Sequence, residues 1–94
     1  MKNEEAAAVL EQELATYRDE TYADLVLRLP GEPITCERMA PTGTKYQIEV
    51  QFFWDDQPGG NVRILGSIDD FGLRAFVPLN RSFIKAPDGS FVGE

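Results

Sequence analysis

Two pairs of adjacent aspartates, Asp55-Asp56 and Asp69-Asp70, are the side chains of this sequence best suited to chemistry. Clustered carboxylates bind divalent metal ions or serve as the acid and base of glycoside hydrolysis. Between the pairs, residues 62–68 alternate apolar and polar side chains, which predicts a strand with one pair in the turn at each end. A strand of about eight residues holds its ends roughly 25 Å apart, too far for one shared site. The pairs are therefore predicted to be two separate turns.

The other residue types also argue against catalysis. The chain has no histidine, the commonest general base and the commonest transition-metal ligand. Cys36 is predicted to point inward beside Ile48, where a thiol behaves as a small apolar side chain. For chemistry by carboxylates alone, Asp55 and Asp56 beside Trp54 are the best candidates. We expect no enzyme, no metal site and no cofactor.

The composition indicates one small acidic domain over residues 1–94. Hydrophobic residues at 43% and charged residues at 27% are typical of a globular protein. The formal net charge of −7 opposes binding to a phosphate backbone, so nucleic acid is not an expected partner. No apolar stretch approaches the ~20 residues that span a bilayer, and the acidic N-terminus lacks the core of a signal peptide. Together with the single cysteine, these features predict a cytoplasmic protein that does not bind a membrane.

Residues 1–29 are predicted to be helical. Asn3 is a favourable N-cap, and apolar residues follow it at helical spacing. These residues are Ala7, Leu10, Leu14 and Tyr17. Thr21, followed three residues later by Asp24, is typical of a second N-cap, and a Pro-Gly pair at residues 30–31 ends the pattern. The pattern fits either two helices or one bent helix over residues 4–29.

Residues 33–94 are predicted to form an antiparallel sheet, because the apolar period changes to two. A turn at residues 40–44 joins two strands in a register that places Cys36 opposite Ile48 on one face. The inward residues are Tyr46, Ile48, Val50, Phe52 and Trp54 on the second strand, Val62, Ile64, Gly66 and Ile68 on the third, and Leu73, Ala75, Val77 and Leu79 on the fourth. A turn at residues 86–90 predicts a short C-terminal hairpin. The predicted fold is α+β, with an N-terminal helix or helix pair packed on one face of a four-stranded antiparallel meander.

An apolar patch is predicted on the face of the sheet that the helices leave uncovered. A short loop after the third strand pairs Leu65 with Phe76, and Phe53 lies within diagonal reach. Arg63 and Arg74 border these side chains. Such a patch is typical of a contact surface for another protein. The alternative is that the C-terminal segment covers it.

A second candidate site is a ligand pocket between the helices and the sheet. Its predicted lining is Tyr17, Tyr22, Tyr46 and Trp54. Inward tyrosines supply an apolar wall with a polar tip, which suits a small molecule. Ordinary core packing explains the same four residues at least as well.

The second half of the chain resembles a family of small uncharacterised bacterial proteins. The resemblance rests on IEVQFFWDDQPGGNVRILGSIDD, RAFVPL and SFIKAPDGSFVGE, of which the closing APDGSFVGE is the most specific part. It covers about half the chain, residues 46–94. The resemblance implies a bacterial origin and a similar fold, and it brings no activity, cofactor or site residue.

Two functions from different classes remain open on the sequence alone. The first is an interaction module, in the manner of an inhibitor or immunity protein, whose acidic charge steers it toward a basic protein while an apolar anchor supplies affinity. The second is a small-molecule binder that uses the tyrosine pocket. A homodimer through the outer apolar patch is compatible with either function.

Overall fold

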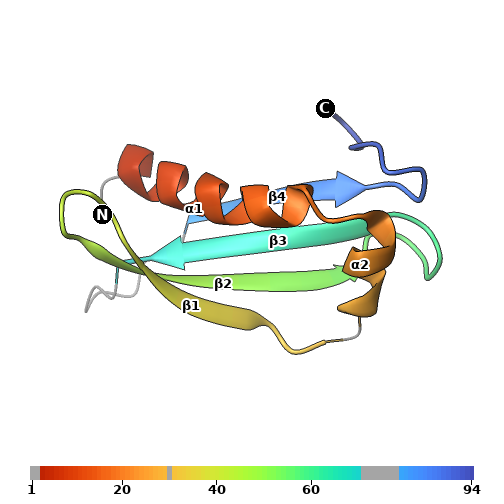
Figure 1. Ribbon diagram of the computed structural model, residues 1–94, viewed down its shortest axis with the longest axis horizontal. Helices are drawn as coiled ribbons and strands as arrows, with labels where there is room; N and C mark the ends of the chain where they lie inside the picture. Colours follow the sequence, from red (N-terminus) through yellow and green to blue (C-terminus); the bar gives the residue numbers. More distant parts are fainter. Residues whose placement is uncertain (1–2, 30, 71–78) are drawn as a thin grey trace.

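The computed structural model describes residues 3–29, 31–70 and 79–94, which form two helices followed by four strands (Figure 1). The strands are β1 (Ile34–Met39), β2 (Lys45–Trp54), β3 (Val62–Asp69) and β4 (Leu79–Lys85). They form one antiparallel sheet in the order β1-β2-β3-β4. Both helices pack on the same side of the sheet, which we call the inner face, and the opposite side is the outer face. The predicted α+β class is confirmed.

The N-terminal segment forms two helices and not one bent helix. Helix α1 spans Asn3–Arg18, with acidic residues in its first turn and a basic residue in its last, as the helix dipole favours. Helix α2 spans Tyr22–Leu27 and is capped by Thr21, whose hydroxyl accepts the Asp24 amide at 3.1 Å. The cap that the sequence predicts therefore separates the two helices.

The hairpin of β1 and β2 has the predicted turn and register. The Ala40 amide donates to the Thr44 carbonyl at 2.9 Å, and Gly43 adopts the positive φ of 90° that this turn requires. Cys36 lies opposite Ile48, as predicted. The inward side chains of β2 and β3 alternate with outward ones along both strands, so the period-two pattern is confirmed there.

The fourth strand differs from the prediction. β4 spans Leu79–Lys85, whereas the sequence pattern favoured residues 73–79, of which 73–78 lie outside the described residues. Ile68 pairs with Leu79, so the predicted pairing of Ile68 with Leu73 is wrong. The same register overturns the predicted pairs Ile64–Val77 and Leu65–Phe76, because β3 faces Phe83 and Ser82 at those positions.

The error has a physical cause in the inward side chains of β4. Opposite Gly66 and Val62 on the inner face, this strand places Arg81 and Lys85. Arg81 Nε lies 3.7 Å from a carboxylate oxygen of Glu11 on α1. The Lys85 ammonium is buried and donates to backbone carbonyls at the end of α1. The two inward charged residues have partners on α1. Because they are not apolar, a search for alternating apolar residues does not detect this strand.

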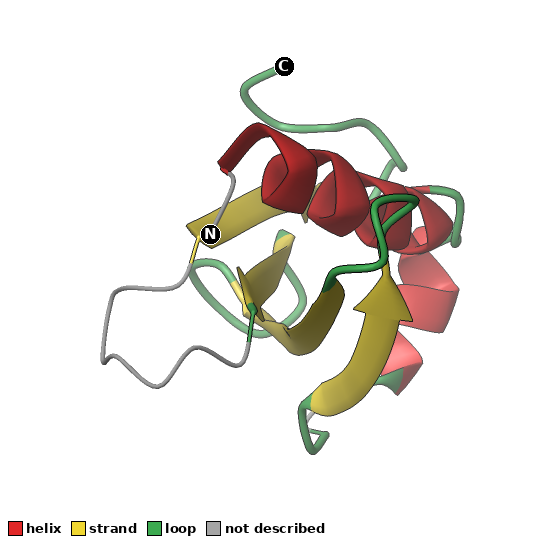
Figure 2. Ribbon diagram, turned by 90° about the vertical axis from the view of Figure 1, so that its left-hand side faces the viewer, coloured by secondary structure: helices red, strands yellow, loops and turns green. Residues whose placement is uncertain are grey.

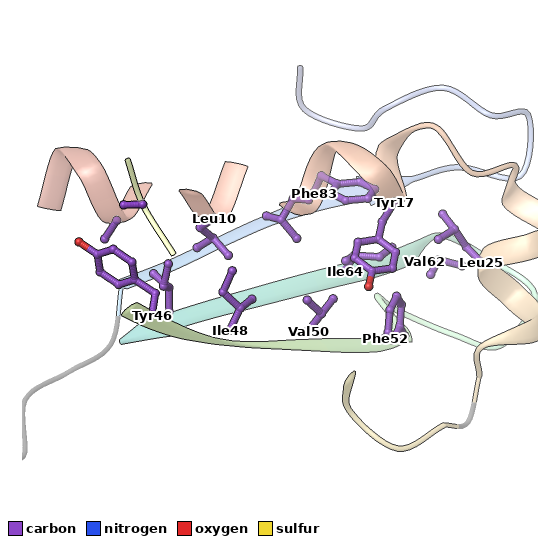
Figure 3. Close-up of a cluster of buried hydrophobic side chains, with 14 residues drawn as sticks. Leu10, Tyr17, Leu25, Tyr46, Ile48, Val50, Phe52, Val62, Ile64 and Phe83 are labelled. Atoms are coloured by element: carbon purple, nitrogen blue, oxygen red, sulfur yellow. The ribbon is translucent and has the colours of Figure 1, made fainter. Parts of the chain in front are cut away.

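A single core fills the space between the helices and the sheet (Figure 3). Its largest fully buried side chains are Leu10, Leu14, Leu25, Tyr46, Ile48, Val50, Val62, Ile64 and Ile68. Gly66 on β3 lets α1 approach closely, since a Cβ at this position would lie 2.8 Å from Leu10 Cδ1 and 3.1 Å from Leu14 Cδ2. The missing side chain is therefore a packing requirement.

The C-terminal segment forms the predicted second turn at residues 86–90 and then pairs back on β4 through Phe91 and Lys85. The Phe91 ring packs edge to face on Phe83, with 5.8 Å between the ring centroids. The Arg18 guanidinium of α1 lies over both rings and forms an ion pair with Glu94 at 2.9 Å. The tail therefore lies on the inner side, against the helix, and is not the segment that would cover the outer face.

Candidate functional site

The outer face of the sheet is the candidate functional site. Figure 2 shows α1 and the C-terminal tail on the same side of the strands, and no described segment packs over the opposite side. Directly opposite residues of neighbouring strands point to the same face, so the outward side chains form rows across the sheet. One end row consists of Phe53, Arg63 and Ile84, and the next of Gln51, Leu65 and Ser82.

These two rows contain three of the five residues predicted to bind a partner. Phe53 is 38% exposed, and Leu65 and Arg63 are half-buried. Phe76 and Arg74 lie outside the described residues, and Leu65 faces Ser82 and not Phe76.

Ile84 is the apolar neighbour that sequence reasoning missed. It is half-buried and lies opposite Arg63, diagonal to Leu65. Phe83 points inward and Ile84, the next residue, points outward. This difference can be read from the sequence only when residues 79–85 are recognised as a strand. The apolar group on the outer face therefore consists of Phe53, Leu65 and Ile84.

The other half of the outer face carries three carboxylates, and the exposed pair Met39 and Lys45 forms its end row. Its other rows are Glu37–Gln47–Asp69 and Thr35–Glu49–Ser67–Asn80. Thr35, Gln47, Glu49, Ser67 and Asp69 line a shallow depression of about 230 Å³. We call the outward side chains Glu37, Glu49 and Asp69 the acidic group. The apolar group and the acidic group thus lie toward opposite ends of a face that no described segment covers, with Met39 beside the acidic group.

The two aspartate pairs are separated as the sequence predicts, and each has a structural setting. Asp55 follows β2 and accepts two contacts from the Arg63 guanidinium, at 2.9 Å from Nε and 2.8 Å from Nη2. Asp69 is the last residue of β3 and lies opposite Gln47, which corrects its predicted place in the turn. Among the described side chains of this face, the carboxylates Glu37, Glu49, Asp55 and Asp69 outnumber the basic groups Lys45 and Arg63, and Asp55 is paired with Arg63.

Among the described residues, no group of three or more His, Cys, Asp or Glu side chains is arranged to hold a metal ion. Burial, followed by the nearby Glu13 carboxylate, raises the pKa of the Cys36 thiol, which stays protonated at neutral pH. Over the same ranges, no helix combines the length and apolar character needed to traverse a bilayer.

The four aromatic residues of the predicted ligand pocket are not brought together. Tyr17 packs edge to face on Phe52, with 5.3 Å between ring centroids, at one end of the core (Figure 3). Tyr46 lies near the other end of the same strand as Phe52, roughly 20 Å away at the usual rise per residue. The Tyr22 hydroxyl donates to a backbone carbonyl in the loop after β2, and Trp54 packs at the edge of the core. Each ring thus has its own packing role.

Tyr46 has a consequence for stability at high pH. Its buried hydroxyl donates to Glu5 at 2.7 Å. Burial, then the bond to Glu5 and nearby carboxylate charges, raises the pKa of Tyr46 from 10.0 to about 12. The folded protein therefore holds this proton more tightly than the unfolded chain, and the resulting stability, complete below pH 10, is lost as the pH rises toward 12.

We expect wild type to lose more free energy of unfolding than Tyr46→Phe between pH 10 and 12. Denaturant unfolding of both proteins across this range measures the difference. Other groups titrate equally in the two proteins, so they cancel. Parallel pH profiles would show that the Tyr46 hydroxyl is not perturbed by folding.

Comparison with known proteins assigns no family to this arrangement. No protein-family model matches the chain, and no curated protein or solved structure is significantly similar to it.

Proposed function

We propose that this protein is a non-catalytic interaction module that binds a basic protein through the outer face of its sheet. The supporting observation is that this face, which no described segment covers, carries the apolar group toward one end and the acidic group toward the other. Protein interfaces commonly combine a buried apolar or aromatic anchor with polar surroundings. Phe53 is the anchor of the apolar group because, of its three side chains, Phe53 is the exposed one, at 38%.

Charge identifies the kind of partner. The protein carries a formal net charge of −7, and Asp55 neutralises Arg63, which lies between Phe53 and Ile84. Such a surface accelerates encounters with a positively charged protein and opposes those with an acidic one. A second copy of this chain would bring two acidic surfaces together, which argues against a homodimer through this face.

The biological setting proposed is an inhibitor-like or immunity-like role in the bacterial cytoplasm. It follows from the resemblance of residues 46–94 to small bacterial proteins and from the acidic, histidine-free composition. A small-molecule function has less support, because the aromatic residues predicted to line its pocket lie at different ends of the core.

The test is binding of a partner by wild type and by Phe53→Asp, with Leu27→Asp as the matched control. Leu27 on α2 is 81% exposed, so its substitution introduces the same charge without touching the outer face. We expect Phe53→Asp to weaken the complex at least about tenfold, as loss of an interface anchor does, while Leu27→Asp keeps wild-type affinity.

Partners captured by wild type are identified, purified and titrated against all three proteins, whose folding is checked by circular dichroism. A basic partner whose affinity falls with added salt and with Phe53→Asp supports the proposal. Equal affinity for Phe53→Asp and wild type contradicts it, because the outer face is then not the contact surface.

A further inference from the structure

Strand β1 forms one edge of the sheet and directs backbone groups outward. In an antiparallel hairpin, hydrogen bonding to the partner strand alternates along the chain. Since Ala40 bonds Thr44 across the turn, the alternation turns the backbone groups of Cys36 toward β2 and those of Thr35 and Glu37 away from it. The Glu37 carbonyl accepts a bond at 2.9 Å from the side chain of Arg38, which agrees with this outward direction. No described strand pairs with this edge.

A groove runs beside the same edge on the inner face. It has a volume of about 380 Å³ and lies between α1 and β1. Its lining is Val9, Gln12, Glu13 and Thr16 from α1, with Arg38, Met39, Ala40 and Pro41 from β1 and the turn. The strand contacts of α1 are concentrated on β3 and β4, and the groove lies on the side of α1 that faces β1. Side chains of a strand added to β1 would enter it from alternate positions.

Charge differs between the two sides of this edge. In the groove, the Glu13 carboxylate is held by the Arg38 guanidinium at 2.9 Å, so the groove accepts uncharged side chains. On the outer face, Glu37 stands at the edge and continues into the acidic group through Gln47. A basic side chain directly opposite Glu37 is favourable. If the β1 edge of a second copy were added instead, it would bring its own Glu37 to this edge, and like charges repel.

We propose that the β1 edge binds an extended basic segment of another protein by adding it as an antiparallel fifth strand. Its Lys or Arg side chains face Glu37 and the acidic group, and its small apolar side chains enter the groove. Pro33 and Pro41 flank β1 and limit the added strand to about six residues, since proline interrupts a ladder. The inference rests on the proposed function and specifies how the basic partner is held.

The probe is a capped seven-residue peptide of alternating Lys and Val, with a matched Glu-Val peptide as the charge control. Nuclear magnetic resonance of the labelled protein follows hydrogen exchange of individual amides. We expect the Lys-Val peptide to slow exchange at the Thr35 and Glu37 amides at least about fivefold, and the Glu-Val peptide to leave it unchanged. Equal effects of the two peptides would overturn the charge argument.

Backbone methylation distinguishes strand addition from attraction between charges. In an antiparallel pair, the peptide amides that bond the edge belong to residues whose side chains share the face of Glu37, which are the lysines. Methylating the lysine amides should abolish binding, and methylating the valine amides should preserve it, although both peptides keep the same charge. Binding of both methylated peptides would overturn the proposal.

Two protein variants complete the test. Glu37→Pro removes the outward amide without touching the ladder to β2, and Glu37→Gln removes the charge but keeps the amide. We expect peptide binding to be lost in Glu37→Pro and weakened several-fold in Glu37→Gln. Phe53→Asp should still bind the peptide, because Phe53 lies at the far end of the outer face. Binding that survives Glu37→Pro but not Phe53→Asp would overturn the edge site while supporting the outer face as the contact surface.

Discussion

Substitution of Gly66 by valine is expected to reduce the free energy of unfolding by about 3 kcal/mol. A Cβ at this position meets the buried Leu10 and Leu14 at 2.8 and 3.1 Å, so the added methyl groups have no space without displacing α1. Urea denaturation measures the change. Ser67→Val is the control, because Ser67 points to the uncovered outer face and its substitution should change stability by no more than about 0.5 kcal/mol.

A second substitution tests whether the contact with Leu10 is the cause. Leu10→Ala alone should cost about 3 kcal/mol, because Leu10 is fully buried in the core. Combined with Gly66→Val, it opens space where the valine needs it, so the double variant should lose at least about 1 kcal/mol less than the sum of the single losses. If the loss in the double variant equals the sum of the two single losses, the contact between Gly66 and Leu10 is not what destabilises Gly66→Val.

Replacement of Lys85 by methionine is expected to reduce the free energy of unfolding by about 2 kcal/mol. The Lys85 ammonium is only 7% exposed and donates to the carbonyl oxygens of Arg18 at 3.0 Å and Glu20 at 2.5 Å. The Arg18 carbonyl is at the end of α1, where the helix dipole favours a positive charge, and Glu20 lies two residues beyond that end. Methionine preserves the length of the side chain but leaves both acceptors without this donor.

Lys45→Met provides the control for this prediction. Lys45 is exposed on β2, so its loss should change stability by no more than about 0.5 kcal/mol. Equal denaturation midpoints for the two variants would mean that Lys85 does not anchor β4 to the end of α1.

Local sequence pattern was sufficient to predict the helices, the first hairpin and the outward direction of Phe53 and Leu65. The Thr21 cap acts through the amide of a residue three positions away, so its signal is contained in a few adjacent residues. The turn at residues 40–44 sets the register of β1 and β2 in the same local way. Alternation along β2 and β3 predicted that Phe53 and Leu65 point to the outer face, and the structure places both there.

Tertiary structure decided the fourth strand and the full candidate site. Sequence alternation favoured residues 73–79, but β4 spans Leu79–Lys85, where the inward Lys85 donates to a carbonyl of α1 and Arg81 lies 3.7 Å from Glu11. Those partners are distant in sequence, so no local pattern reports them. Only this register brings Ile84 beside Phe53 and Leu65, and only the packing of α1 on the sheet places the groove on the side of α1 that faces β1. Short-range hydrogen bonding and alternation determined the elements, whereas contacts between layers determined which strand completed the sheet and which surfaces remained uncovered.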